Sequence, residues 1–382
     1  MRALRELRHT GKPQPLPLMR IKEAHYDNKP GFIVGTLSGS RWRHQSMGLT
    51  LDHIIDQEKL AELQLHASDN LKLWEKSKET PPQKVEVVHQ DFGDAALDAT
   101  MKHGKIYPVL NMASSFFPGG AVLEGGDAQE ENIWHRSTCA QTLLSKGVYY
   151  DAARKCFLYD ENTRKLLSAQ EKMTPEELQA LGIRRGVKVP EAYKVFMGDQ
   201  PQICFRGAEV FVPTGAEEGF SSKHAFVADA DLSYQFLPKN RIFPFYELRS
   251  AAPELIGKTI EPSDKLYAED LSRRVGAQLD TLILKGKTDA ILGAWGCGSF
   301  KNYPDIVAQV YREEIEKRAG NFQHIVFPII DTEHEANFEI FKKHLDGLKL
   351  GASKSALSPY GLYAPRDTKP TTNEGLSQTP SI

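Results

Sequence analysis

The sequence predicts an α/β fold in which helices cover a largely parallel sheet. Short β-branched runs alternate along the chain with helical patterns, the order typical of layered α/β domains. Several of these runs are continuously apolar, as expected for strands buried on both faces. The expected strands occupy residues 85–89, 106–112, 209–213, 242–248, 289–294 and 325–330. Such a sheet usually binds ligands beyond the carboxyl ends of its strands.

Helical patterns lie around these strands. Residues 54–73 carry spaced leucines. Residues 304–318 place apolar side chains on one face, with a proline in the first turn and Asn302 as a possible cap. Residues 174–182 begin with Thr174, then proline and glutamate, which predicts a capped helix start.

The chain divides into one expected main domain and two flanks. Its 382 residues allow two or three domains at roughly 150 residues each. Residues 1–80 are expected to be a partly helical extension, loose and proline-containing through Pro30. Residues 81–350 are expected to form the α/β domain, with an elaborated insertion at about 151–240 rather than a second core. Residues 351–382 are poor in large apolar side chains, which predicts a disordered tail.

Composition excludes two classes of protein. Lys and Arg number 48 against 50 Asp and Glu, for a net charge of −2. This balance argues against a protein held to nucleic acid mainly through its phosphates. No run approaches the roughly 18 apolar residues that a membrane-spanning helix needs. We therefore expect a soluble protein with neither nucleic acid nor membrane as a direct partner.

The cysteines indicate a reducing compartment. Cys139, Cys156, Cys204 and Cys297 show no C-x-x-C spacing, so we expect reduced thiols, no metal site and a cytoplasmic location. The first twenty residues lack the continuous apolar block of a secretory signal. Glu6 and the lack of serine there argue against a mitochondrial presequence.

Several common mechanistic motifs are incomplete. Residues 286–288 end like a P-loop, but Thr281 stands where its first glycine is required. Residues 334–335 begin like an H-E-x-x-H zinc motif, but Phe338 occupies the place of the second histidine. The G-x-S-x-G elbow of serine hydrolases is also missing from the sequence.

Residues 109–144 form the first segment that points to chemistry. A strand leads into a glycine-rich loop and then into a helix expected to begin near Asp127 and to continue through Leu144. Asp127 and Glu130 fit a capping box, and the helix dipole alone favours acidic residues there. The long glycine-rich loop favours a functional interpretation, because its amides can approach a diphosphate and place a carboxylate beside a nucleotide sugar.

Residues 291–310 form the second such segment. A buried strand again runs into glycines, here Gly293, Gly296 and Gly298, followed by an amphipathic helix. Their order is G-x-x-G-x-G, so the dinucleotide motif G-x-G-x-x-G of dehydrogenases is not indicated. Two glycine loops in one α/β domain fit a clamp around a diphosphate.

Four stretches together resemble a known family. They are Asn111-Met112-Ala113, Pro118-Gly119-Gly120-Ala121, Gln129-Glu130-Glu131 after a spacer of seven residues, and Gly293-Ala-Trp-Gly-Cys-Gly-Ser-Phe300. This pattern is similar to the microbial-type poly(ADP-ribose) glycohydrolases, whose signature is a run of glycines, a short spacer and Q-E-E. The resemblance implies a macrodomain-like three-layer α/β/α sandwich with a mixed, largely parallel sheet, a bound ADP-ribose and no cofactor.

The resemblance also implies roles for single residues. Glu131 would be the catalytic acid/base, Glu130 would hold a ribose hydroxyl, and Gln129 would shape the loop. Phe300 would pack on the distal ribose. The remaining substrate-binding positions implied are Asn111, Ala113, Gly119, Gly120, Ala121, Gly296, Cys297, Gly298 and Ser299. Ala121 stands at the place of the third glycine, where its methyl group narrows the approach of the backbone to the ligand.

Asp91 and Phe92 carry two alternative interpretations. By resemblance, Asp91 would recognise adenine and Phe92 would flank its ring. Asp91 is equally well placed to cap a helix that begins after it.

Three functions remain open at this point. The expected reaction is hydrolysis of a ribose glycosidic bond, through an oxocarbenium-like state that needs a nearby anion and a proton donor. The favoured substrate is the ribose–ribose bond at the chain ends of poly(ADP-ribose). The alternatives are a hydrolase of mono-ADP-ribosylated protein and a non-catalytic binder of ADP-ribose. An intact Glu130-Glu131 pair favours hydrolysis.

Overall fold

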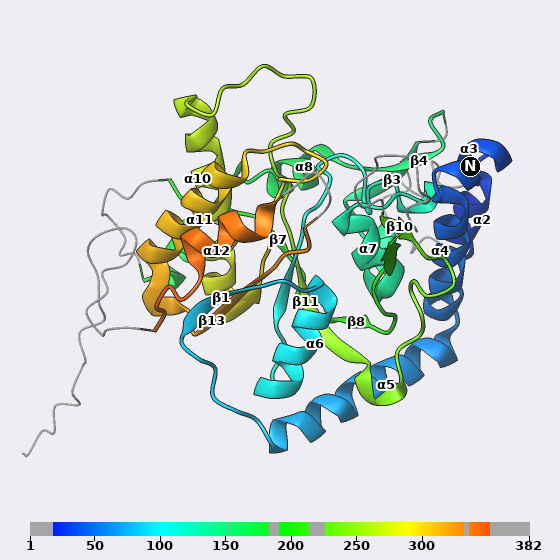
Figure 1. Ribbon diagram of the computed structural model, residues 1–382, viewed down its shortest axis with the longest axis horizontal. Helices are drawn as coiled ribbons and strands as arrows, with labels where there is room; N and C mark the ends of the chain where they lie inside the picture. The colour runs from blue at the N-terminus through cyan, green and yellow to red at the C-terminus, as the bar shows by residue number, and fades with distance from the viewer. Residues whose placement is uncertain (1–17, 152, 183–190, 214–225, 332–335, 352–382) are drawn as a thin grey trace, which may run out of the picture.

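A central sheet carries helices on both sides (Figure 1). The structure, a computed structural model, describes residues 18–151, 153–182, 191–213, 226–331 and 336–351. The predicted tail from 352 onward and residues 1–17 lie outside these ranges.

Within the described residues, seven strands pair in the order β1-β13-β12-β2-β11-β7, and β8 also pairs with β11. These strands are β1 (Lys84–Val88), β2 (Pro108–Asn111), β7 (Phe196–Met197), β8 (Gln202–Cys204), β11 (Phe243–Arg249), β12 (Asp289–Ile291) and β13 (His324–Pro328). The five strands from β1 to β11 in this order run parallel, whereas β7 and β8 run antiparallel to β11. The prediction of a mixed, largely parallel sheet is confirmed.

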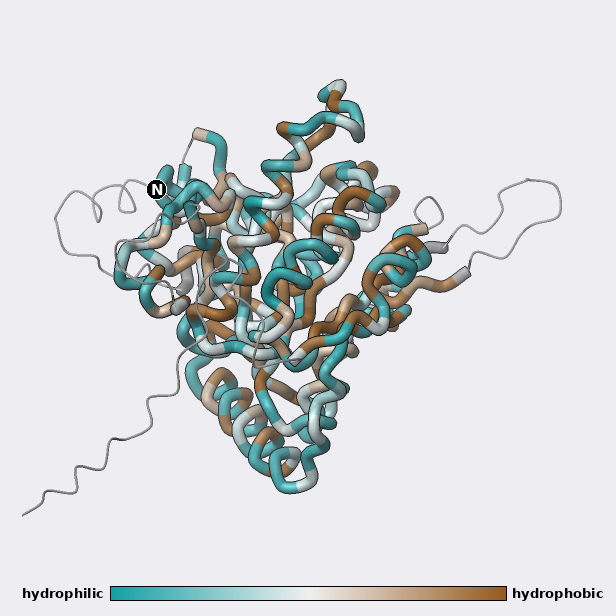
Figure 2. Tube along the Cα trace, turned by 90° about the vertical axis from the view of Figure 1, so that its left-hand side faces the viewer, coloured by the Kyte–Doolittle hydropathy of each residue, from teal (hydrophilic) through white to brown (hydrophobic). Residues whose placement is uncertain are grey.

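Two helical layers bury the two faces of this sheet (Figure 1). One layer contains α10 (Lys265–Leu284), α11 (Pro304–Arg318) and α12 (Asn337–Leu345). The other contains α4 (Ser40–Ile55), α5 (Gln57–Lys76), α6 (Phe92–His103) and α7 (Gln129–Arg136). Ile325 and Phe327 pack into the first layer, and Val326 between them packs into the second. The three-layer prediction is thus confirmed, and in Figure 2 hydrophobic residues lie mainly in the interior of the trace, while hydrophilic residues are frequent on its outer helices.

The N-terminal residues are more ordered than the sequence suggested. The expected loose lead-in contains α2 (Leu18–Asp27), and α3 (Phe32–Leu37) follows it. Ile21 and Ala24 of α2 are buried in the core beside α4, so the prediction of a loose segment is wrong there. The helix expected at 54–73 is divided by Asp56, which ends α4 and caps α5 by accepting from two amides.

The segment 151–240 shares the core of the main domain. It adds β7 and β8 to the sheet and buries Phe157 and Phe205. The strand expected at 209–213 is real but lies outside the main sheet, because β9 pairs only with β10. The capping box at Thr174 is confirmed, with Glu177 as its partner. The remaining elements here are β3 (Val148–Asp151), β4 (Cys156–Tyr159), α8 (Glu161–Leu167), β5 (Glu171–Lys172), α9 (Pro175–Ala180), β6 (Tyr193–Lys194), β9 (Phe211–Pro213) and β10 (Phe226–Ala228).

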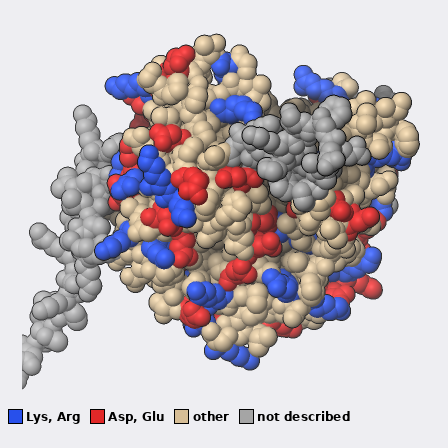
Figure 3. Space-filling view, viewed as in Figure 1, with Lys and Arg blue, Asp and Glu red and all other residues tan. Residues whose placement is uncertain are grey.

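Short 3-10 helices complete the described chain at η1 (Val122–Glu124), η2 (Thr138–Leu144), η3 (Lys239–Arg241) and η4 (Ala319–Asn321). Among the described helices, none is both long and apolar enough to cross a membrane. Basic and acidic side chains are interspersed over the face shown in Figure 3, as the nearly balanced charge predicts.

Candidate active site

A cavity of about 1080 Å³ opens where β2, β11 and β12 end and their loops begin. Its walls come from the loop and helix start at 112–131, from 252–274 and from 296–300. Cys156, Phe157 and Ser168 of the 151–240 segment also line it. This is the position at which parallel α/β sheets bind ligands, and both predicted glycine loops reach it.

Glu130 and Glu131 in the first turn of α7 both reach this cavity and are only 3% and 7% exposed. Glu130 is held by two backbone amides: Oε2 accepts from Ser114 N at 2.7 Å and Oε1 from Gly119 N at 3.0 Å. Glu131 Oε1 accepts from Ala121 N at 2.7 Å. The adjacent carboxyl groups are thus bound by the loop that the sequence singled out.

The first glycine loop fits closely around these side chains. Gly119 and Gly120 have φ angles of 79° and 57°, a conformation that favours glycine. A Cβ on Gly119 would lie 2.5 Å from the Trp134 ring, and one on Gly120 would lie 2.2 Å from Glu131 Oε1. Each glycine is therefore required both by its backbone conformation and by the close approach of a side chain.

Gln129 ties the start of α7 to the end of β2. Its Oε1 accepts from Met112 N at 2.9 Å and its Nε2 donates to Leu110 O at 2.8 Å. These contacts agree with the loop-shaping role that the resemblance implied.

Burial raises the pKa of both acids. For Glu130 it raises the pKa well above the ordinary value, and the charge of Glu131 acts in the same direction. Burial also raises the pKa of Glu131; the Ala121 amide opposes this shift, and the charges of Asp127 and Glu124 add to it. The pair is therefore biased toward holding a proton, which a general acid requires.

The second loop is fixed by Asn302, which does not cap α11 as expected. Tyr303 is the N-cap residue, and Asn302 Nδ2 donates to Pro253 O at 2.8 Å and to Gly296 O at 3.0 Å. Gly296, with φ 74°, leaves space that a side chain would close. Gly298, Ser299 and Phe300 then line the cavity.

The helix that carries the acids differs from the prediction at both ends. Ala128 occupies the N-cap position without a side-chain hydrogen bond, so the Asp127 and Glu130 capping box is wrong. The helix stops at Arg136 instead of continuing to Leu144, because Ser137 is extended and begins the 3-10 helix η2.

Asp91 and Phe92 lie outside the residues that line the cavity. Asp91 caps α6 by accepting from Gly93 N and Asp94 N, and it also pairs with buried Arg136 at 2.6 Å. The same guanidinium lies over Phe92, with Arg136 Cζ 4.9 Å from the centroid of the Phe92 ring. The structure supports the capping interpretation of Asp91, and contact with adenine stays a prediction.

Four further predicted residues are buried and are not among the described residues that line the cavity. They are Asn111, Ala113, Gly119 and Cys297. Asn111 Nδ2 donates to Glu247 Oε1 at 2.7 Å, which fixes the end of β2 to β11.

Several residues that line the cavity were not predicted from the sequence. Ser114 donates its amide to Glu130, and Phe116 and Phe117 stand directly before the Pro118 turn. Lys258 and Arg274 bring positive charge to the opposite wall. The two phenylalanines beside the glycine loop were the available signal, whereas nothing local marks Lys258 or Arg274.

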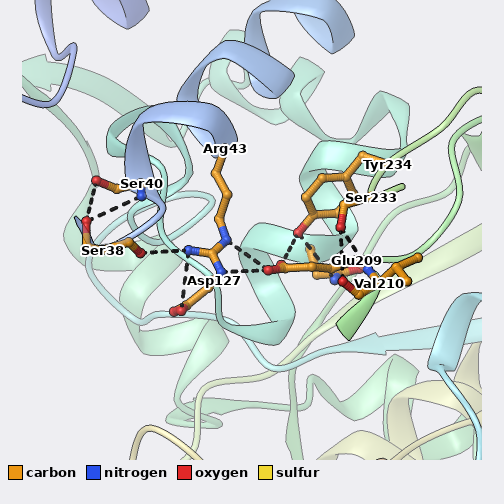
Figure 4. Close-up of polar contacts among 9 residues, drawn as sticks. Ser38, Ser40, Arg43, Asp127, Glu209, Val210, Ser233 and Tyr234 are labelled. Atoms are coloured by element: carbon orange, nitrogen blue, oxygen red, sulfur yellow. Dashed lines mark hydrogen bonds and ion pairs between the residues drawn. The ribbon is translucent and has the colours of Figure 1, made fainter. Parts of the chain in front are cut away.

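A buried ion pair lies close to the start of α7, the helix that carries Glu130 and Glu131 (Figure 4). Arg43 of α4 donates to Glu209 Oε1 from Nε at 3.0 Å and from Nη2 at 2.6 Å. Tyr234 donates to the other oxygen of Glu209 at 2.7 Å. Arg43 Nη1 lies 3.7 Å from Asp127 at the cavity edge. Helix α4 and the 151–240 segment thus meet behind the loop that holds Glu130 and Glu131. Within the described ranges, no cluster of three or more side chains is arranged to hold a metal ion.

Comparison with known proteins agrees with the motifs. Residues 50–168 match the family model described as microbial-type PARG, catalytic domain. The poly(ADP-ribose) glycohydrolase (PARG) structure from Thermomonospora curvata is 18% identical, with a TM-score of 0.46, and covers 79% of this chain and 100% of that one. PARG from Deinococcus radiodurans in complex with ADP-ribose is 20% identical, with a TM-score of 0.43, and covers 73% of this chain and 90% of that one. No curated protein matches. The family match spans the glycine loop and the Gln129-Glu130-Glu131 motif, and it confirms the resemblance to the microbial-type PARG family that these residues predicted.

Proposed function

We propose that the chain hydrolyses ribose–ribose bonds of poly(ADP-ribose) from the chain end and releases ADP-ribose. The observation that carries this proposal is the pair of buried carboxyl groups at the cavity, held by three amides of one glycine loop. A non-catalytic binder needs no such pair. The match of residues 50–168 to a PARG catalytic domain supports the same reaction.

Glu131 is the proposed acid/base. Its Oε1 is fixed by the Ala121 amide, and Oε2 makes no hydrogen bond to the described residues, so Oε2 is the atom available to the substrate. The protonated acid donates to the leaving ribose oxygen as the glycosidic bond breaks, and the resulting carboxylate then removes a proton from the attacking water. The raised pKa favours the first step.

Glu130 has a different proposed role. Both its oxygens already accept from backbone amides, so its main effect is to hold the loop that places Glu131. Contact of a remaining lone pair with a ribose hydroxyl is part of the proposal. Phe300 packs on the distal ribose, and the amides around Gly120 and Gly298 face the diphosphate.

The proposal includes a macrodomain-type fold, ADP-ribosylated protein as the partner and a cytoplasmic location. The cysteines are free thiols in the structure, which suits a reducing compartment.

The test is incubation with automodified poly(ADP-ribosyl) protein and, separately, with mono-ADP-ribosylated protein, followed by chromatography of the products. We expect free ADP-ribose as the early product from the polymer. Long oligomers as early products would contradict cleavage at chain ends. Activity on mono-modified protein alone would show that mono-ADP-ribosylated protein, and not the polymer, is the substrate. Binding of ADP-ribose without cleavage of either substrate would show that the protein is a non-catalytic binder.

A further inference from the structure

Two exposed aromatic rings stand on the wall of the cavity without an assigned role. Phe116 and Phe117 are 49% and 43% exposed, although they lie on the loop that holds the catalytic acids. Exposed aromatic rings at a nucleotide site provide stacking surfaces for bases, each contributing about 1–3 kcal/mol.

The backbone beneath these rings is firmly held. Ser114 Oγ accepts from the amides of Phe116 and Phe117 at 3.2 and 3.1 Å, and the Ser114 amide itself binds Glu130. Phe116 O accepts from Tyr159 N of β4 at 2.9 Å. The backbone that carries the rings is therefore fixed relative to the acids.

A cation accompanies the first ring. The guanidinium of Arg164, in α8, lies over Phe116 at 5.2 Å from the ring centroid. Within the described part of the chain, the buried Nε of Arg164 has no hydrogen-bond partner. An aromatic surface beside a guanidinium matches a nucleotide, whose base stacks and whose diphosphate attracts a cation.

The location of these groups indicates which part of the substrate they meet. Phe116 contacts β4 and α8 of the 151–240 segment, whereas the Phe300 loop packs on the other wall, where Leu255 N donates to Phe300 O at 3.0 Å. The rings thus lie on a different wall of the cavity from Phe300, which is proposed to hold the distal ribose of the bound unit. The cavity of about 1080 Å³ slightly exceeds the roughly 300–1,000 Å³ typical of a single ligand.

We propose that Phe116 and Phe117, with Arg164, form a subsite for the adenine and diphosphate of the next ADP-ribose unit, on the leaving-group side of the bond that is cut. This inference rests on the proposed function and deepens it, because the subsite makes the polymer the better substrate. A mono-modified protein offers no second adenine there.

The test compares kcat/KM on polymer with kcat/KM on mono-ADP-ribosylated protein, expressed as a ratio for each variant. Phe116→Leu with Phe117→Leu keeps apolar bulk but removes both rings, and we expect the ratio to fall about 5- to 150-fold, the range of one lost base stack. Phe116→Trp keeps a ring and should retain the parent ratio. Phe211→Leu, which changes a ring that is 51% exposed in β9 away from the cavity, is the matched control.

Arg164→Gln tests the cation independently of the rings. It should raise KM for the polymer and weaken the dependence of that KM on salt, because one phosphate contact is lost. Arg154→Gln, which removes an exposed arginine already paired with Asp151, should do neither.

A ratio unchanged in the double leucine variant, or a salt dependence unchanged in Arg164→Gln, would overturn the subsite while leaving the proposed function intact. A parent protein that cleaves no polymer would instead overturn the proposed function itself. If the double variant unfolds, the single variants Phe116→Leu and Phe117→Leu, together with Arg164→Gln, decide.

Discussion

Glu130 and Glu131 are neighbours in the chain but have different tasks. Glu130 is bound at both oxygens and fastens residues 114–119 to α7, whereas Glu131 is bound at one oxygen only. This division needs a loop whose amides point inward on both sides, and positive φ at Gly119 and Gly120 provides it. The chemistry of the site therefore depends on the glycines as much as on the acids.

Gly120→Ala tests that dependence. The new Cβ would lie 2.2 Å from Glu131 Oε1, so the carboxyl group must move. Because a displacement of about 1 Å can cost ~10²-fold in rate, we expect kcat/KM on polymer to fall by at least that factor. Gly286→Ala is the control, since Gly286 has φ 65° but nothing within 4 Å of its added Cβ. An equal loss of kcat/KM in both variants would show that backbone strain alone, and not displacement of Glu131, causes the effect.

At the residue scale, the sequence could predict those residues that belong to one short motif. Gln129, Glu130 and Glu131 line the cavity as expected, and the sequence could indicate this because the motif lies in consecutive residues. The role of Asp91 stayed open because its partner Arg136 is 45 residues away in the chain. Asn302 was misassigned for the same reason, since it donates to the carbonyl of Pro253, which is 49 residues away in the chain.

At the scale of elements, α4 supports the loop that holds Glu130 and Glu131. Its His44 Nδ1 hydrogen-bonds the carbonyl of Leu123 at 2.7 Å, and its Arg43 pairs with Glu209 and approaches Asp127. The N-terminal extension is thus part of the domain that forms the site.

Arg43→Met tests this support. Both partners of the Arg43 and Glu209 pair are buried, so removing the cation leaves an uncompensated carboxylate, and we expect a loss of about 3–5 kcal/mol in the free energy of unfolding. Urea denaturation measures it. Lys165→Met, which removes an exposed pair with Glu161, should leave the midpoint nearly unchanged. A midpoint for Arg43→Met equal to the parent's would show that α4 contributes no support through this pair.

Most elements were predictable because apolar periodicity is local. The strands of the parallel sheet and α11 appear within a few residues of their expected bounds. The N-terminal helix α2 and the separate β9–β10 pair were not predicted, because their identity depends on partners distant in the chain. The Ser137 break after α7 likewise depends on tertiary packing, since Phe205 N donates to Arg136 O there.

At the scale of the whole molecule, buried histidines and buried carboxyl groups have opposite effects on how the free energy of unfolding depends on pH. Burial lowers the pKa of His25 to about 3, that of His135 well below its ordinary value, and that of His44 in the same direction. These groups are neutral in the fold and take up protons on unfolding below about pH 6.5. Their stabilisation is therefore present above that pH and is lost as pH falls toward 3. Glu130 and Glu131, with raised pKa values, act oppositely: their destabilising effect grows as pH rises above about 4.5.

His25→Leu isolates the first effect. We expect the parent's free energy of unfolding, measured in urea between pH 7.5 and 5.0, to fall more steeply with acidification than that of the variant. The difference in slope should approach about 1.4 kcal/mol per pH unit below pH 6.5. Identical slopes would mean that His25 is not kept neutral by the fold.

The central claim is that Glu131 cycles a proton at a bound ADP-ribose. The most direct measurement is turnover of poly(ADP-ribose) by Glu131→Gln beside calorimetric binding of free ADP-ribose to the same variant. The glutamine keeps the shape and the hydrogen bond to Ala121 N, so we expect binding within a few-fold of the parent. Turnover should fall by ~10²–10⁴-fold, the contribution of a positioned proton transfer. Turnover equal to the parent's, with ADP-ribose bound, would contradict the account.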